Sequence, residues 1–175
     1  MTTIGKTMQD AINEQINKEF FSSYLYLSMA AYFEDKNLTG FGHWMRLQAE
    51  EEREHAMKFY NYVLDAGGRV YLKGIEAPAT DWKSNLVVAE QVAEHEAKVT
   101  ASIHALYELA LQEKDYAAQM LLQWFITEQV EEEKNAAELV AKLRLIEERG
   151  TAVLMLDHRL SKRGGGNGDE EGAEE

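Results

Sequence analysis

The fold is decided by residues 45–66, whose sequence is MRLQAEEEREHAMKFYNYVLDA. Steps of three and four along this stretch select one helical face, formed by Met45, Gln48, Glu52, His55, Phe59, Tyr62 and Ala66. Such spacing predicts an amphipathic helix whose selected face is buried. The middle of this face is polar, and a buried carboxylate is costly unless it is paired or neutralised. Glu52 and His55 should therefore have partners on neighbouring helices.

Glycine, proline and charged breaks divide the rest of the chain into further helical segments. We expect helices at about 7–34 and 40–66, a helix capped by Asp81 or Ser84 that runs to about 113, one from the Lys114-Asp115 break to about 146, and a short fifth helix at 151–160. Short connections predict two antiparallel hairpins. After Gly67-Gly68, a loop of about 15 residues is long enough to travel the length of a bundle. The chain is thus expected to be all-α, an antiparallel four-helix bundle with one long crossover.

The same polar interruption recurs on all four long segments. The other three buried faces are mostly apolar but carry, at mid-length, Glu19, Glu96, and Gln129 with Glu132. Residues equidistant from a hairpin turn lie side by side, which places Glu19 near Glu52 and His55, and Glu96 near Glu132. The spacing Glu19…Glu52-x-x-His55 also returns 77 residues later as Glu96…Gln129-x-x-Glu132. Two similar hairpins would thus present two similar half-sites to one centre.

Six convergent residues define the predicted site: Glu19, Glu52, His55, Glu96, Gln129 and Glu132. Oxygen-rich ligands with a single imidazole suit iron or manganese better than zinc. Di-iron carboxylate bundles take a glutamate from each of two helices and a Glu-x-x-His pair from each of the other two. Here Gln129-x-x-Glu132 replaces the second pair, so we expect an asymmetric site that holds iron less tightly on that side. A metal-free network of hydrogen-bonded glutamates is the alternative.

Further side chains surround this centre. Glu51, Glu128 and Glu131 could bind a third cation, since Glu128 and Glu131 share a helical face; ordinary solvated glutamates are the alternative. Tyr26, two turns beyond Glu19, could donate an electron or a hydrogen bond, or serve only as a core residue. Trp124 is interpreted as core.

Composition limits the function. The net charge of −13, from 31 acidic and 18 basic residues, disfavours nucleic acid and anionic membranes as partners. The absence of cysteine excludes disulfides, zinc-thiolate sites and iron–sulfur clusters. Neither a signal-peptide core nor a run of about 20 apolar residues occurs, so a cytoplasmic protein is expected. We expect one domain over residues 1–160 and a flexible, acidic Gly/Glu-rich tail over 161–175.

Over about residues 4–160 the chain resembles the bacterial and archaeal non-haem ferritins. The resemblance is carried by the segments NEQINKE (13–19), EEEREH (50–55), His95-Glu96 and LQWFITEQVEEEK (122–134). It implies a ferritin-like bundle that oxidises Fe(II) with dioxygen at a di-iron ferroxidase centre. It also implies self-association into a hollow shell, usually of 24 subunits, in which ferric oxyhydroxide is deposited.

The resemblance also implies roles for individual residues. Glu19, Glu52 and His55 match the first iron subsite, and Glu52, Glu96 and Glu132 match the second, with Gln129 beside it. Glu51, Glu128, Glu131 and Glu132 match the third site, and Tyr26 matches the tyrosine beside the centre, so Tyr26 and Glu52 are the residues expected to take part in catalysis. In haem-binding bacterioferritins a methionine lies between the Glu and the His of the second helix. Arg53 and Glu54 fill that gap here, so no haem is expected.

Three other functions remain open from the sequence. A soluble di-iron oxidoreductase acting on a peroxide or a small substrate would need a substrate pocket and a reductase, and would stay small in assembly. A binding or structural helical bundle would turn over no metal. A DNA-protecting miniferritin would place its ligands between subunits and often carries a basic tail, whereas this tail is acidic and the third and fourth helices carry ligands.

Overall fold

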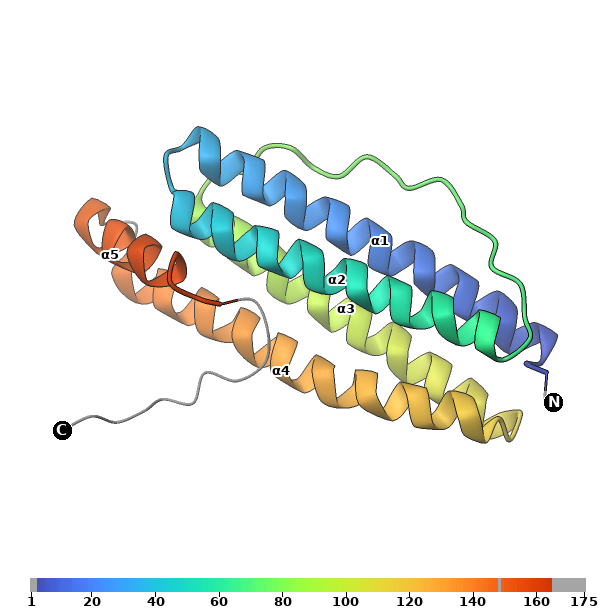
Figure 1. Ribbon diagram of the computed structural model, residues 1–175. Coiled ribbons are helices and arrows are strands. Elements are labelled where there is room, and N and C mark those ends of the chain that lie inside the picture. The colour runs from blue at the N-terminus through green and yellow to red at the C-terminus, as the bar shows by residue number, and fades with distance from the viewer. Residues whose placement is uncertain (1–2, 148, 165–175) are drawn as a thin grey trace.

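A computed structural model describes residues 3–147 and 149–164 of the 175-residue chain, and all of its regular structure there is helical. The helices are α1 (Lys6–Asp35), α2 (Thr39–Asp65), α3 (Asn85–Gln112), α4 (Tyr116–Ile146) and α5 (Gly150–Leu160). Figure 1 shows α1 to α4 lying lengthwise beside one another as a bundle. The expected helix ends are correct to within one or two residues. Most of the expected flexible tail, residues 165–175, lies outside the described residues.

Two tight hairpins build the bundle, with α1 packed on α2 and α3 packed on α4. At the turns, Asn37 (φ 59°) and Lys114 (φ 55°) adopt the left-handed conformation that reverses the chain. The side chain of Asp115 then caps α4 by accepting a hydrogen bond from the backbone N–H of Ala118 at 3.0 Å. Lys114-Asp115 is therefore the break that the sequence predicts.

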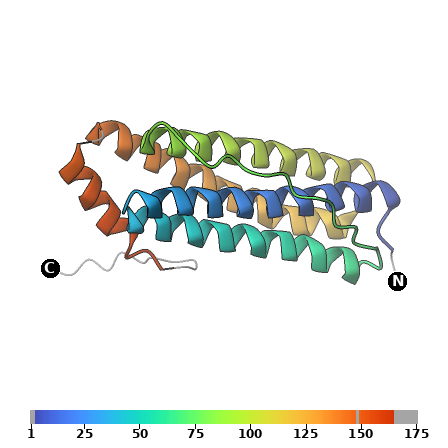
Figure 2. The ribbon, with the colours of Figure 1, turned by 90° about the horizontal axis from the view of Figure 1, so that it is seen from above.

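A long crossover joins the hairpins, and it runs over residues 66–84, longer than expected. Figures 1 and 2 show it running beside α1 from one end of the bundle to the other. Gly67 (φ 70°) lets the chain leave α2, and Asn13 fixes the segment by donating to the carbonyl of Arg69 and accepting from the N–H of Tyr71. Of the two predicted caps of α3, Ser84 is the one used, because its Oγ accepts from the N–H of Val87.

The short helix α5 folds back across one end of the bundle against α2 and α4 (Figure 2). Its Asp157 accepts a hydrogen bond from the N–H of Phe41 at 2.9 Å, which satisfies a donor at the start of α2. The approach requires Gly40, since a Cβ there would lie 1.8 Å from the carbonyl oxygen of Asp157. No helix within residues 3–147 and 149–164 is long and apolar enough to cross a membrane.

The bundle interior consists of two apolar clusters separated by a polar layer. One cluster, toward α5, includes Phe33, Phe41 and Leu139, and the other includes Ile12, Phe59 and Ile103. Between them every long helix contributes buried polar side chains, namely Glu19, Glu52, His55, Glu96, Gln129 and Glu132. The chain therefore places charge at the centre of its own core, where an uncompensated carboxylate is costly.

The predicted helical faces are largely those that are buried. Steps of three and four also place Ser23 and Ile146 on the predicted buried faces of the first and fourth helices. These two residues, with Tyr62 and Ala66, differ from the prediction because they are only half-buried. On α1 it is Ser22, not Ser23, that is fully buried, because real helices turn every 3.6 residues and a fixed choice of three- and four-residue steps drifts from the buried face.

Candidate metal centre

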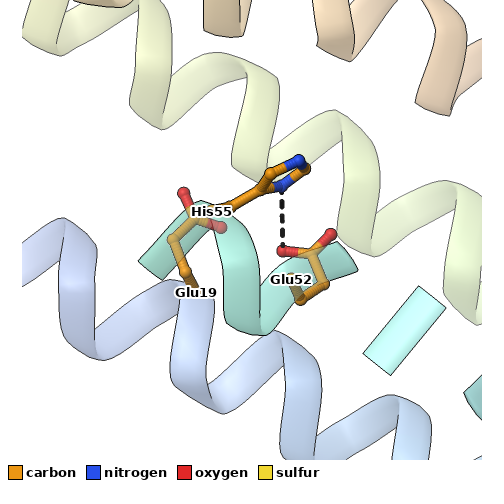
Figure 3. A group of neighbouring side chains, drawn as sticks. All are labelled: Glu19, Glu52 and His55. Carbon is orange, nitrogen blue, oxygen red and sulfur yellow. Dashed lines mark ion pairs between the residues drawn. The ribbon is translucent and has the colours of Figure 1, made fainter. Parts of the chain in front are cut away.

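Three buried side chains from α1 and α2 form the tightest group. Glu19, Glu52 and His55 each offer a ligand atom within 4.8 Å of the other two, and their exposed fractions are 1%, 1% and 4%. Glu52 and His55 share a face because they are three residues apart on α2, and the antiparallel α1 brings Glu19 beside them. Figure 3 shows the three side chains converging. His55 Nδ1 lies 3.7 Å from Glu52 Oε2.

This group carries unsatisfied polar atoms. Among the described residues, Glu19 Oε2 and Glu52 Oε2 are buried side-chain oxygens without a hydrogen-bond partner. Burial raises the pKa of Glu19 well above its ordinary value, and the neighbouring charge of Glu52 raises it further. Burial, followed by the charge of Glu96, does the same to the pKa of Glu52. A cation between these oxygens would remove both the missing partner and the repulsion.

The second hairpin supplies a contrasting group around Glu96. Tyr26 donates a hydrogen bond to Glu96 Oε1, and Gln129 Nε2 donates to Glu96 Oε2 at 3.2 Å and to Thr100 Oγ1 at 3.1 Å. Burial raises the pKa of Glu96, while the bonds from Tyr26 and Gln129 lower it. Both oxygens of Glu96 are therefore engaged by protein donors, unlike those of Glu19 and Glu52.

Glu132 links these groups electrostatically to the residues around them. Its pKa is raised to about 8, first by burial and then by the charges of Glu96, Glu51 and Glu128. Glu51 and Glu128 are half-buried, and burial raises the pKa of Glu51. Glu131 is exposed. Three of the acids expected to hold a third cation therefore interact electrostatically, namely Glu51, Glu128 and Glu132. The fourth, Glu131, lies on the solvent side of α4.

The interpretation of Trp124 as a core residue is wrong. Its side chain is 36% exposed and lies edge-on to the His55 ring, with centroids 5.5 Å apart, while Lys58 Nζ sits 3.5 Å from the centroid of the indole. Together these residues line an open groove of about 720 Å³ that also includes Glu51 and Glu128. Its lining provides an acidic approach from solvent to His55.

The structure thus gathers Glu19, Glu52 and His55 in one group and joins Tyr26 and Gln129 to Glu96. Sequence reasoning missed Gln15, which is buried and donates from Nε2 to Glu19 Oε1 at 2.8 Å. Its position one turn before Glu19 was the available signal, since residues four apart on a helix are neighbours.

An antiparallel four-helix bundle with a buried layer of carboxylates and one histidine is the architecture of the ferritin-like metal proteins. The family profile described as a ferritin-like domain matches residues 9–146. A bacterial non-heme ferritin of Bacteroides fragilis is 41% identical over 160 residues, covering 91% of this chain and 99% of that protein. One from Staphylococcus aureus is 35% identical over 160 residues, covering 91% of this chain and 96% of its own.

Comparison with solved structures leads to the same family. The open-pore ferritin of the archaeon Archaeoglobus fulgidus superposes with a TM-score of 0.92 at 51% identity, covering 93% of this chain and 100% of that one. A form of the same ferritin engineered to be closed superposes with a TM-score of 0.91, also at 51% identity, covering 93% and 99% of the two chains. The chain therefore belongs to the ferritin family of iron-storage proteins.

Proposed function

We propose that this protein is a ferroxidase: it oxidises Fe(II) with dioxygen at a di-iron centre and deposits ferric oxyhydroxide inside a hollow shell of its own subunits. One observation carries the proposal. Glu19, Glu52 and His55 converge within 4.8 Å, and two of their buried oxygens have no hydrogen-bond partner among the described residues. Such a group is unfavourable without a cation and well suited to one that prefers oxygen ligands with an imidazole.

The first Fe(II) would be held by Glu19, Glu52 and His55, and the second by Glu52, Glu96 and Glu132, with Glu52 shared. Each of the two Fe(II) ions gives up one electron, and one dioxygen accepts both electrons and two protons, which reduces it to the level of hydrogen peroxide. The carboxylate ligands favour this oxidation because their negative charges stabilise Fe(III), with its charge of +3, more strongly than Fe(II), with its charge of +2. The protein contributes the ligand set and the low-dielectric surroundings, and the reactivity is that of the metal.

The two subsites would differ in how readily they release iron. Glu96 already accepts hydrogen bonds from Tyr26 and Gln129, so binding a cation there competes with protein donors. The first subsite has free oxygens and a histidine. We therefore infer that the second subsite holds iron more weakly and passes it onward, through Glu51 and Glu128, toward the acidic groove.

The relatives support assembly and storage. Both curated relatives are named bacterial non-heme ferritins, and the archaeal neighbour is a ferritin described as having an open pore. By this likeness we infer a shell of 24 subunits. Haem is not part of the proposal, since Arg53 and Glu54 occupy the positions between Glu52 and His55 and both are exposed.

Substitution of Glu52 tests the centre. Glu52→Ala should abolish rapid Fe(II) oxidation, measured as oxygen consumption in the first seconds after mixing, because both subsites lose a shared ligand. Glu138→Ala is the matched control, since Glu138 is an exposed helical glutamate that pairs with Lys142 and does not line the acidic groove. An unchanged initial rate in Glu52→Ala, with the helical content of the parent, would exclude this centre.

Storage is tested separately by size exclusion of protein loaded with Fe(II) in air, with protein and iron monitored together. A large shell that co-elutes with far more iron than its binding sites can hold is expected. A small oligomer carrying about two irons per chain, the ligand capacity of a di-iron site, would instead identify a di-iron oxidoreductase.

A further inference from the structure

Gln15 forms a hydrogen bond with Glu19, one ligand of the proposed centre. It is 1% exposed, and its Nε2 donates to Glu19 Oε1 at 2.8 Å. The bond occupies one oxygen of the carboxylate and leaves Oε2 as the oxygen without a partner.

The orientation of the Gln15 amide follows from its partners. Lys18 Nζ lies 2.7 Å from Ser102 Oγ, and an ammonium group can only donate, so Ser102 accepts there. The hydroxyl proton of Ser102 is then free to go to Gln15 Oε1, 2.5 Å away. The carbonyl of Gln15 therefore faces Ser102, and its NH₂ group must face Glu19.

All three hydrogen bonds run in one direction, from Lys18 through Ser102 and Gln15 to Glu19. The outer end is an exposed cation and the inner end a buried carboxylate, so each bond polarises the next in the sense that favours negative charge on Glu19. The chain crosses from α1 to α3 and back. Its outer end lies in a groove of about 520 Å³ lined in part by the crossover, which shares no lining residue with the groove that contains Trp124.

We propose that Gln15 and Ser102 are a positioning pair that holds Glu19 with one oxygen reserved for a divalent cation. The inference rests on the proposed function in taking Glu19 as a ligand, and deepens it by explaining why the first subsite is ready to bind. On the other hairpin both oxygens of Glu96 are taken by Tyr26 and Gln129. The asymmetry of the centre therefore includes the hydrogen bonds behind the ligands as well as the ligands themselves.

Anaerobic Co(II) titration of the metal-free shell tests the pair, with the affinity of the first bound ion and its visible absorption spectrum as readouts. Gln15→Leu should weaken that affinity by about 10- to 100-fold, as loss of a partner behind a metal ligand does. It should also alter the spectrum, because Glu19 becomes free to bind through both oxygens. Ser102→Ala should change both readouts in the same direction but less, and Ser102→Thr, which keeps the hydroxyl, should restore the parent values.

Lys98→Met is the matched control. Lys98 lines the same groove but pairs with Glu94 at 2.7 Å and takes no part in the chain of bonds, so its loss should leave Co(II) binding unchanged. If Gln15→Leu does not assemble, Ser102→Ala and Ser102→Thr carry the test. Parent-like affinity and spectrum in Ser102→Ala overturn the proposal.

Glu19→Gln separates this inference from the function beneath it. Weaker Co(II) binding in Glu19→Gln together with parent-like binding in Gln15→Leu and Ser102→Ala would overturn the positioning role alone. Parent-like binding in Glu19→Gln itself would mean that Glu19 is not a ligand, and the proposed centre would fail with it.

Discussion

The hydroxyl of Tyr26 on α1 donates a hydrogen bond to Oε1 of Glu96 on α3, joining the two hairpins at the polar layer. Both side chains are 1% exposed. Burial raises the pKa of the Tyr26 hydroxyl well above its ordinary value, and the charge of Glu96 raises it further, so the phenol stays protonated and remains a donor. The interaction therefore orients a carboxylate of the proposed second subsite.

Tyr26→Phe should destabilise the metal-free protein and slow Fe(II) oxidation. Loss of a hydrogen bond to a charged group costs about 1.5–3 kcal/mol of unfolding free energy. Loss of a partner behind a ligand slows turnover by about 10- to 100-fold. Denaturant unfolding and stopped-flow oxidation measure the two effects.

Tyr32→Phe provides the control for that experiment. Tyr32 is also buried on α1, and its hydroxyl donates to the carbonyl of Trp82 at 3.0 Å, outside the polar layer. It should lose stability but keep the parent oxidation rate. Equal oxidation rates in the two variants would show that the Tyr26 hydroxyl has no influence on the centre.

The stability of the metal-free protein should fall as the pH rises from about 6.5 to about 8. Below that range His95 contributes the opposite slope, because burial lowers its pKa from 6.5 to about 4. Glu132 has its pKa raised from 4.5 to about 8, so across this window the folded state retains a proton that the unfolded state has lost. Each such group lowers the free energy of unfolding by about 1.4 kcal/mol for every pH unit between its unfolded and folded pKa values. Glu19, Glu52 and Glu96 also have raised pKa values and add with the same sign.

Thermal unfolding of the metal-free protein at several pH values measures this slope. Glu132→Gln should flatten it, because the substituted amide does not titrate. Bound Co(II) should flatten it too, since the cation stabilises the deprotonated carboxylates. An unfolding temperature that rises between pH 6.5 and pH 8 would contradict the predicted sign.

The helices, their order and the residues of the polar layer could be predicted from the sequence because they depend on local signals. Apolar spacing on α3 selects Val92, Glu96 and Ile103, all of which are buried. The break at Lys114-Asp115 is visible as an interruption of a helical pattern. Counting outward from each turn brings Glu19 beside His55, since the geometry within a hairpin is set by a few residues.

Contacts between the hairpins could not be predicted in the same way. The Tyr26–Glu96 hydrogen bond depends on how α1 lies against α3, and the long crossover leaves that register undetermined. Trp124 adjoins the buried Phe125 in sequence, yet it is 36% exposed and packs against Lys58 and His55 of α2, contacts that its own helix does not determine. The metal-binding role of the six residues stays a prediction, and the convergence of Glu19, Glu52 and His55 supports it for the first subsite.

Glu128→Gln should remove one weakly bound Co(II) ion per subunit while leaving fast Fe(II) oxidation close to the parent rate. Glu128 is half-buried, lines the acidic groove with Glu51 and raises the pKa of Glu132, which is the electrostatic arrangement that a third cation would relieve. Equilibrium dialysis counts the bound ions. Glu131→Gln is the informative comparison, because Glu131 is exposed and should have the smaller effect; the reverse order would move the third cation to the outer face of α4.

Metal binding at His55 should quench the fluorescence of Trp124. The two rings lie edge-on with centroids 5.5 Å apart, so a paramagnetic Co(II) ion bound to the His55 ring would lie near the indole. The other two tryptophans are 2% and 8% exposed and lie in the apolar cluster toward α5, so they should respond little. Trp124→Phe should therefore abolish most of the quenching, whereas Trp82→Phe should retain it. Full quenching in Trp124→Phe would place the first bound ion away from His55, and the ligand assignment of α2 would have to change.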